Sequence, residues 1–128
     1  MNFTEHAGKV VLAAAGIPVP AGILVESPEA AAVAAGRIGA CVIKAQVPAG
    51  KRGKAGGIKL ASTPDEARAK TAEILRLEIG GHAVCQVLVD PQIEIAHEYY
   101  AAVLNDPATK GPLLLFSFEG GMDIEELA

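Results

Sequence analysis

The chain has 128 residues, 51% of them hydrophobic, and a formal net charge of −4. This length and composition predict a domain-sized chain with a core, and they exclude a disordered tail. The acidic balance, the lack of tryptophan and the few other aromatic residues argue against a nucleic-acid surface. No apolar run approaches the ~18 residues of a membrane span, and no secretory signal opens the sequence, so we expect no membrane partner and a cytoplasmic location.

The elements expected in the first part of the chain are a helix, a strand, a second helix and a second strand, at residues 2–15, 22–25, 29–38 and 41–47. The pattern Asn2-x-x-Glu5 is typical of a helix cap, and the glycine and prolines over 16–20 prevent the first helix from continuing. Ser27-Pro28 supplies a cap and a first-turn proline for the second helix. The second strand is apolar and β-branched, which predicts a buried strand.

A basic, glycine-rich loop follows that strand and precedes an answering strand at 58–61. The segment 44–59 carries five of the eleven basic residues of the chain and none of its fifteen acidic ones, and four glycines lie within residues 50–57. Glycine N–H groups can approach an anion closely, and Lys and Arg donate charge-assisted hydrogen bonds to it. The loop therefore predicts a phosphate site, with a mobile, solvated turn as the alternative. We expect residues 51–57 to be mobile without ligand, because no large apolar residue anchors them.

The second part of the chain completes a β-α-β-β-α-β order. Thr63-Pro64-Asp65-Glu66 is a capping box for a helix to about residue 77, whose buried face is marked by Ala67, Thr71, Ile74 and Leu75. A strand over 83–89 ends at the break Asp90-Pro91-Gln92. This order predicts an α+β fold with a split β-α-β arrangement, two helices lying on one side of an antiparallel sheet.

A hairpin over 97–105 and 113–118 comes next, and residues 122–128 begin a helix. Cys41 and Cys85 fall in apolar, strand-like runs without paired spacing, which predicts two buried free thiols. A Walker A loop would need glycine at 48 and serine or threonine at 55, where the chain has Pro48 and Ala55. No cluster with metal-ligand spacing and no nucleophile motif occurs, so we assign no catalytic and no metal-binding residue.

Two segments of the chain are the most specific: Val42-Ile43-Lys44-Ala45-Gln46-Val47 and Arg52-Gly53-Lys54-Ala55-Gly56-Gly57-Ile58-Lys59. Together they resemble the amino-terminal part of the succinate–CoA ligase (succinyl-CoA synthetase) β subunit and its relatives. Gly16-Ile17-Pro18-Val19-Pro20, Glu98-Tyr99-Tyr100 and Glu119-Gly120-Gly121 keep the same order and spacing. The basic loop, with Phe116-Ser117-Phe118, is also similar to the related ATP-citrate lyase and citryl-CoA synthetase chains.

This resemblance implies an ATP-grasp fold made of a small lobe and an incomplete second lobe. Residues 1–18 would be the opening helix of the larger lobe, residues 19–92 the small lobe, and residues 93–128 the start of the larger lobe. The nucleotide-binding residues that it implies are Lys44, Lys51, Arg52, Gly53, Asp90, Ile93 and Glu98. In this assignment Lys44 reaches the phosphates, the tripeptide 51–53 folds over them as a lid, Asp90 lies at the hinge and Glu98 accepts hydrogen bonds from the nucleotide.

Each of these assignments has an alternative in ordinary structural terms. Lys44 could be a strand-edge lysine with a solvated head, Glu98 an outward strand carboxylate and Asp90 simple turn chemistry before Pro91. The chain also departs from the family pattern in three places. Lys51 replaces a glycine of the lid, Pro48 replaces a histidine, and Asp90 replaces a glutamate, which leaves lid mobility and nucleotide preference open.

The function implied by the resemblance is that of a nucleotide-binding portion of an acid–thiol ligase. Such a ligase converts a carboxylate, CoA and ATP into acyl-CoA, ADP and phosphate, as in the tricarboxylic acid cycle. ATP or GTP with magnesium is the expected cofactor, its metal ligands lying outside this chain. The expected partners are the remainder of the β subunit and an α subunit that carries the CoA site and the phosphohistidine. His6, His82 and His97 are poor candidates for that histidine.

Two expectations concern the chain by itself. It should be inactive as a ligase, and it should self-associate through the apolar hairpin. The alternative function is a non-catalytic ATP-grasp-like module with an assembly or regulatory role. The acid substrate, whether succinate, malate, citrate or another, and the choice between ATP and GTP stay open.

Overall fold

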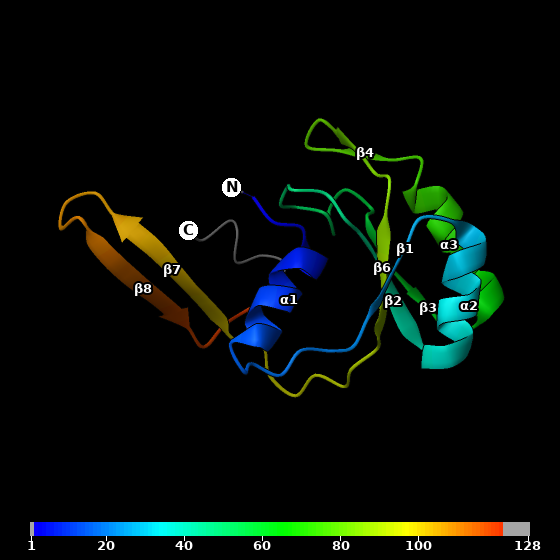
Figure 1. Cartoon of the computed structure of the whole chain (residues 1–128), viewed down its shortest axis with the longest axis horizontal. Coiled ribbons are helices and arrows are strands. Elements are labelled where there is room, and N and C mark those ends of the chain that lie inside the picture. Colours follow the sequence, from blue (N-terminus) through cyan, green and yellow to red (C-terminus); the bar gives the residue numbers. More distant parts are fainter. Residues whose placement is uncertain (1, 122–128) are drawn as a thin grey trace. The chain divides into compact units, whose positions relative to one another are not determined.

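The computed structural model describes residues 2–121 and divides the chain into two compact units, Met1–Gln92 and Ile93–Ala128 (Figure 1). The helix expected at 122–128 lies outside the described residues. Within the described part, no helix is long and apolar enough to cross a membrane. The assignment of residues 1–18, 19–92 and 93–128 to ATP-grasp lobes stays a prediction.

A four-stranded sheet forms the centre of the first unit. Its strands are β1 (Ile23–Val25), β2 (Cys41–Ala45), β3 (Ile58–Ala61) and β6 (Val87–Pro91), in the order β1-β6-β2-β3 with antiparallel neighbours throughout. Because β6 lies between β1 and β2, the path from β1 through α2 (Pro28–Ile38) to β2 is a split β-α-β unit. The path from β3 through α3 (Pro64–Ile74) to β6 is a second one, with β2 in the gap. The predicted arrangement is confirmed.

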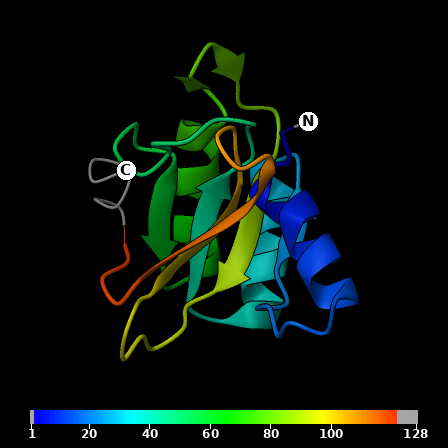
Figure 2. The same cartoon turned by 90° about the vertical axis from the view of Figure 1, so that its left-hand side faces the viewer.

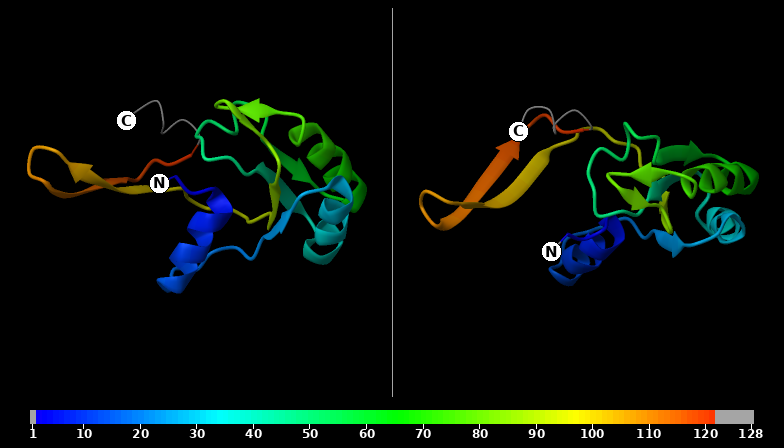
Figure 3. Two further views of the ribbon diagram at one scale, coloured as in Figure 1. Left: turned by 45° about the horizontal axis from the view of Figure 1, so that its top comes forward. Right: turned by 90° about the horizontal axis from the view of Figure 1, so that it is seen from above.

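The core lies between the sheet and the two helices α2 and α3, which cover one of its faces (Figure 3). Alternate residues of β2, namely Cys41, Ile43 and Ala45, are fully buried against them. The alanines of α2 and Ala67 of α3 let the helices lie close to the strands. Full burial of a side chain such as that of Ile43 contributes about 1.5–3 kcal/mol, so this layer carries much of the stability of the unit.

One hydroxyl in this core has no hydrogen-bond partner. Thr71 of α3 is fully buried, and its Oγ1 is without a donor or acceptor. We expect Thr71→Val to leave the unfolding midpoint unchanged or to raise it, with a gain of up to about 1 kcal/mol, because a methyl group replaces an unsatisfied polar atom. Thermal unfolding measures this directly, and Thr63→Val, which removes a hydroxyl that does accept a hydrogen bond from Glu66 N, should lower the midpoint instead.

The helix caps agree with the sequence in two of three cases. Ser27 and Thr63 cap α2 and α3 as predicted, each accepting a hydrogen bond from the backbone N–H of the third residue of its helix. The predicted cap at Asn2 is wrong, because α1 (Glu5–Ala14) begins after Thr4, whose hydroxyl accepts from Ala7 N at 3.4 Å. A second cap-forming side chain two residues downstream therefore sets the start of this helix.

The segment between α3 and the end of the first unit differs most from the expectation. Two short strands, β4 (Glu78–Ile79) and β5 (His82–Ala83), flank Gly80-Gly81, whose φ angles are 59° and 78°. This tight hairpin takes the start of the predicted strand 83–89, so β6 begins only at Val87. The predicted break at Asp90 is also wrong, since pairing with β2 runs on to Pro91, opposite Cys41.

The two cysteines consequently differ in environment. Cys41 is a buried free thiol, as predicted, and burial raises its pKa. Cys85 lies in the connection between β5 and β6 and is exposed, so the prediction of a buried thiol there is wrong. The apolar run 83–89 has the composition of one strand, but it contains the end of the β4–β5 hairpin, the connection 84–86 and the start of β6.

The second unit is a hairpin of β7 (Tyr100–Asp106) and β8 (Gly111–Ser117), paired over seven positions. Its turn is held by Asp106, which accepts from Ala108 N at 3.0 Å and from the Thr109 hydroxyl at 2.8 Å. Most of its large apolar side chains are exposed: Val103, Leu104, Leu113, Leu114, Phe116 and Phe118. Self-association through this surface stays a prediction.

Candidate functional site

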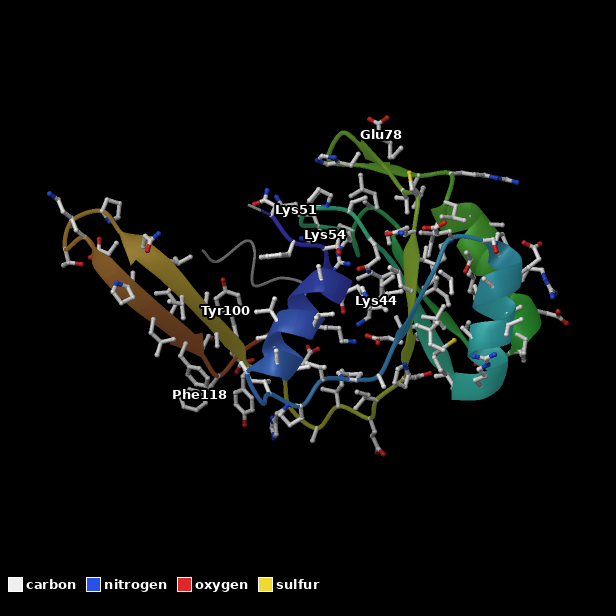
Figure 4. The ribbon with its side chains drawn as sticks, in the orientation of Figure 1. Lys44, Lys51, Lys54, Glu78, Tyr100 and Phe118 are labelled. Carbon is white, nitrogen blue, oxygen red and sulfur yellow. The ribbon has the colours of Figure 1, made fainter. Side chains whose placement is uncertain are left out.

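Helix α1 lies on the sheet face opposite α2 and α3 (Figure 2). Residues of β2 and β6 that alternate away from the core point to this face, because successive side chains of a strand face opposite ways. They include Lys44 on β2 and Asp90 on β6. Figure 4 shows Lys44 between α1 and the strands. The sheet face on which α1 lies therefore carries these charged side chains, whereas the face covered by α2 and α3 is apolar.

Five charged side chains meet there, and we name them the charged cluster: Glu5, Lys9, Lys44, Arg52 and Asp90. Lys44 Nζ donates to Glu5 Oε1 at 2.8 Å and to Asp90 Oδ2 at 2.9 Å. Lys9 Nζ donates to the two oxygens of Asp90 at 2.6 and 2.7 Å. Arg52 donates to Glu5 Oε2 at 2.9 Å and to the carbonyl of Ala45 at 2.8 Å. Three cations thus converge on two carboxylates.

Burial strengthens these interactions. Asp90 is only 2% exposed, whereas Glu5, Lys44 and Arg52 are each about one-fifth exposed. Burial acts to raise the pKa of Glu5, but the hydrogen bonds and charges of Lys44 and Arg52 outweigh it, and the pKa lies below the usual value. Burial acts to lower the pKa of Lys44, but Glu5 and Asp90 outweigh it in turn and raise that pKa. Glu5 and Lys44 are consequently both charged at neutral pH.

The basic loop folds back on itself beside the cluster. Gly57 N donates to Arg52 O at 2.8 Å and Ala55 N donates to Lys51 O at 3.1 Å. A Cβ on Gly57 would lie 2.7 Å from Ile79 Cδ1, so the chain packs tightly against an apolar side chain there. The expectation that no apolar residue anchors the loop is therefore wrong at Gly57, which packs against Ile79. The hydrogen bonds of Arg52 hold the loop at a second point. Mobility of the loop stays a prediction.

The backbone at Lys51 adopts a conformation that favours glycine over lysine. Lys51 has a φ of 59°, in the left-handed region that glycine adopts without strain. The glycine that the sequence resemblance implies at this position would suit this conformation, whereas lysine adopts it at a cost while adding a charge. Lys51 and Lys54 both lie in the loop (Figure 4), and each has an interaction in the structure.

An open cavity of about 150 Å³ adjoins the charged cluster between α1, the segment 19–22 that precedes β1, and strand β6. Its mostly apolar lining consists of His6, Lys9, Val10, Ala13, Val19, Pro20, Ala21, Gly22 and Leu88. Gly22 brings the backbone close to the cluster, since a Cβ at this position would lie 2.2 Å from Asp90 Oδ1. The sequence analysis did not find this cavity, because it forms between segments far apart in the chain.

The structure brings three predicted site residues together and places the others elsewhere. Lys44, Arg52 and Asp90 belong to the charged cluster, while Lys51 and Gly53 lie in the loop. The turn interpretation of Asp90 and the strand-edge interpretation of Lys44 are wrong, since both residues lie on interior strands and form ion pairs.

The two remaining predicted residues, Ile93 and Glu98, lie in the second unit. Glu98 is exposed, and a Cβ on Gly121 would lie 2.9 Å from Glu98 Oε2. Their role in binding stays a prediction. Among the residues that the structure describes, no group of three or more His, Cys, Asp or Glu side chains is arranged to hold a metal ion.

Two members of the charged cluster were missed by the sequence analysis as site residues. Glu5 and Lys9 occur four residues apart on α1 and so share one face of the helix. This spacing was a usable signal for an exposed ion pair within the helix. The structure shows instead that each residue pairs with the sheet, Glu5 with Lys44 and Lys9 with Asp90.

The profile of the ATP-grasp domain family matches residues 2–128. The chain therefore belongs to the ATP-grasp domain family, which confirms the predicted fold class. Two solved structures agree. A Pyrococcus horikoshii protein superposes with a TM-score of 0.82 at 28% identity, over 98% of this chain and 56% of that one. An acetyl-coenzyme A synthetase from Ca. Korarchaeum cryptofilum, solved with coenzyme A and Ca-AMPCP, gives 0.78 at 25% identity, over 91% and 53%.

Curated relatives are more similar in sequence, and they carry the particular resemblance. The β subunit of the GDP-forming succinate–CoA ligase of Thermus thermophilus is 50% identical over the whole of this chain. The β subunit of the ADP-forming succinate–CoA ligase of Rubrobacter xylanophilus is 44% identical over the same span. The chain spans 34% of the length of each of these relatives. The predicted similarity to succinate–CoA ligase β subunits is confirmed.

Proposed function

We propose that this chain is the nucleotide-binding portion of the β subunit of an ADP- or GDP-forming acid–CoA ligase. The main observation in support is that two cations on separate elements, Lys44 of β2 and Arg52 of the loop, both form ion pairs with the same oxyanion. That oxyanion is the carboxylate of Glu5, and its oxygens stand in the places that phosphate oxygens would take. The names of the relatives, GDP-forming and ADP-forming ligases, support a nucleotide as the ligand.

The residues present fit a polyphosphate group. Lysine and arginine donate charge-assisted hydrogen bonds, and the glycines of the loop leave backbone N–H groups open to close approach. In phosphoryl transfer the protein mainly positions the phosphates and neutralises their charge. Lys44 of the sheet and Arg52 of the loop would do this together with Lys51 and Gly53, the loop residues beside Arg52. The adjoining, mostly apolar cavity offers a surface on which a nucleotide base could pack.

The remaining parts of the reaction belong to the proposal for the whole ligase. The nucleotide supplies the phosphoryl group and leaves as its diphosphate, a phosphohistidine on an α subunit carries the group, and the group departs as inorganic phosphate when a carboxylate and CoA are joined as acyl-CoA. Magnesium would balance the phosphate charge through ligands from the rest of the β subunit. The role of this chain is confined to binding, orienting and shielding the nucleotide. The acid substrate is left open.

Calorimetric titration of the chain with ATP, GTP and tripolyphosphate, each with and without magnesium, tests the proposal. We expect one nucleotide to bind more tightly than tripolyphosphate, because the base adds contacts that a bare polyanion lacks. Equal affinity for all three ligands would favour the non-catalytic module that binds any polyanion. No binding of any ligand would remove the phosphate site altogether.

A further inference from the structure

Helix α1 is attached to the sheet by charges more than by apolar packing. None of its residues is buried, and Val10, Val11 and Leu12 are all about half exposed. Part of the space beneath the helix is the cavity of about 150 Å³ and not a packed core. Its side-chain attachments are the ion pairs of Glu5 and Lys9, while His6 N donates to Gln46 Oε1 at 2.9 Å. Such an attachment depends on what else binds the cations.

Within the charged cluster, Glu5 is the partner most easily exchanged. Asp90 is almost fully buried and bound by two lysines, so it holds Lys44 in place without Glu5. The carbonyl of Ala45 likewise holds the guanidinium of Arg52. The Glu5 carboxylate contacts the same two cations and is 22% exposed, whereas Asp90 is 2% exposed. If the Glu5 carboxylate moved away, Asp90 would still hold Lys44 and the Ala45 carbonyl would still hold Arg52. Both cations would then be able to bind another anion.

We propose that Glu5 is an internal competitor for phosphate: a polyphosphate group displaces its carboxylate from Lys44 and Arg52 and thereby loosens the first turn of α1. This inference rests on the proposed function, because it concerns the same cations. The charges support it. The cluster has three positive and two negative side chains, and neutralising Glu5 raises its net charge from +1 to +2. Nucleotide binding and the docking of α1 are then coupled in opposite directions.

The test is the variant Glu5→Gln, which keeps the shape and a hydrogen-bonding oxygen but removes the charge. Tripolyphosphate is titrated into wild-type chain and variant at fixed ionic strength. We expect the variant to bind about 5-fold more tightly or better, the lower end of typical coupling between sites. The matched control is Glu29→Gln, which removes the same charge from the first turn of α2, where the side chain is exposed. It should leave the affinity near the wild-type value.

Hydrogen exchange on the unmodified chain gives a second measurement that needs no variant. Saturating tripolyphosphate should speed exchange of the His6 amide, which donates to Gln46 in the free chain, while amides of β2 stay protected. If the wild-type chain binds tripolyphosphate but Glu5→Gln binds no more tightly and exchange at His6 is unchanged, the competition proposed here is wrong and the anion site stands. If neither protein binds tripolyphosphate, the proposed function and this inference both fail.

Discussion

Replacing Asp90 with alanine is expected to lower the free energy of unfolding by about 3–5 kcal/mol, the range for breaking a buried ion pair from one side. The carboxylate is 2% exposed and accepts hydrogen bonds from Lys9 and Lys44. Its removal leaves the Lys9 ammonium group, which is 13% exposed, without this counterion. The attachment of α1 to β6 should be lost first, and the centre of the sheet weakened with it.

Urea unfolding followed by circular dichroism measures this effect. Asp65→Ala is a suitable control, because Asp65 pairs with Arg68 on an exposed helix surface, where ion pairs contribute little. Asp90→Asn, which keeps the shape and loses the charge, should fall between wild type and the alanine variant. A loss below about 1 kcal/mol in the alanine variant would show that the two lysines find water or other acceptors at no great cost.

Replacing Lys44 with alanine is expected to weaken nucleotide affinity by about 1–3 kcal/mol while leaving the melting temperature close to that of wild type. The fold should persist because the other ion pairs of the cluster remain, Lys9 with Asp90 and Arg52 with Glu5. The lost affinity is the lost charge-assisted hydrogen bond to phosphate. Calorimetric titration of wild type and variant with the preferred nucleotide measures this loss of affinity.

Lys59→Ala is the matched control for this experiment. Lys59 lies on the neighbouring strand β3 and carries the same charge, but it pairs with Glu73 of α3 and so belongs to the helix side of the sheet. Equal losses in both variants would mean that general positive charge, and not the position of Lys44, attracts the ligand. An unchanged affinity in Lys44→Ala, with wild-type melting, would remove this residue from the site.

Local patterns predicted most of the first unit, because its elements carry local signals. An apolar run with β-branched residues marked β2, and hydroxyl residues followed by proline marked the starts of α2 and α3. The prediction for residues 78–91 was wrong for a reason that is also local. A two-residue hairpin at Gly80-Gly81 and a link through Cys85 are too short to show a period, so the apolar residues merged into one apparent strand.

The charged cluster was only half predictable for a different reason. The basic residues of the loop lie close together in the sequence, so their charge is evident from the sequence itself. The residues that pair across the cluster are far apart in the sequence, with a separation of 39 positions for Glu5 and Lys44 and of 81 positions for Lys9 and Asp90. No local pattern indicates which distant acid meets which base. Ile93 and Glu98 were assigned from family resemblance alone, and the sequence around them carries no physical signal for binding.

The strand order β1-β6-β2-β3 has a consequence for folding during synthesis on the ribosome. Strands β1 and β2 are made early but have no direct pairing, since the strand that joins them, β6, is the last of the unit to emerge. Until then β2 and β3 are the strands of this sheet that can pair, and the edges of β1 and β2 that β6 will occupy are open to wrong partners. A chain synthesised only as far as residue 86 therefore exposes unpaired strand edges that the finished unit covers.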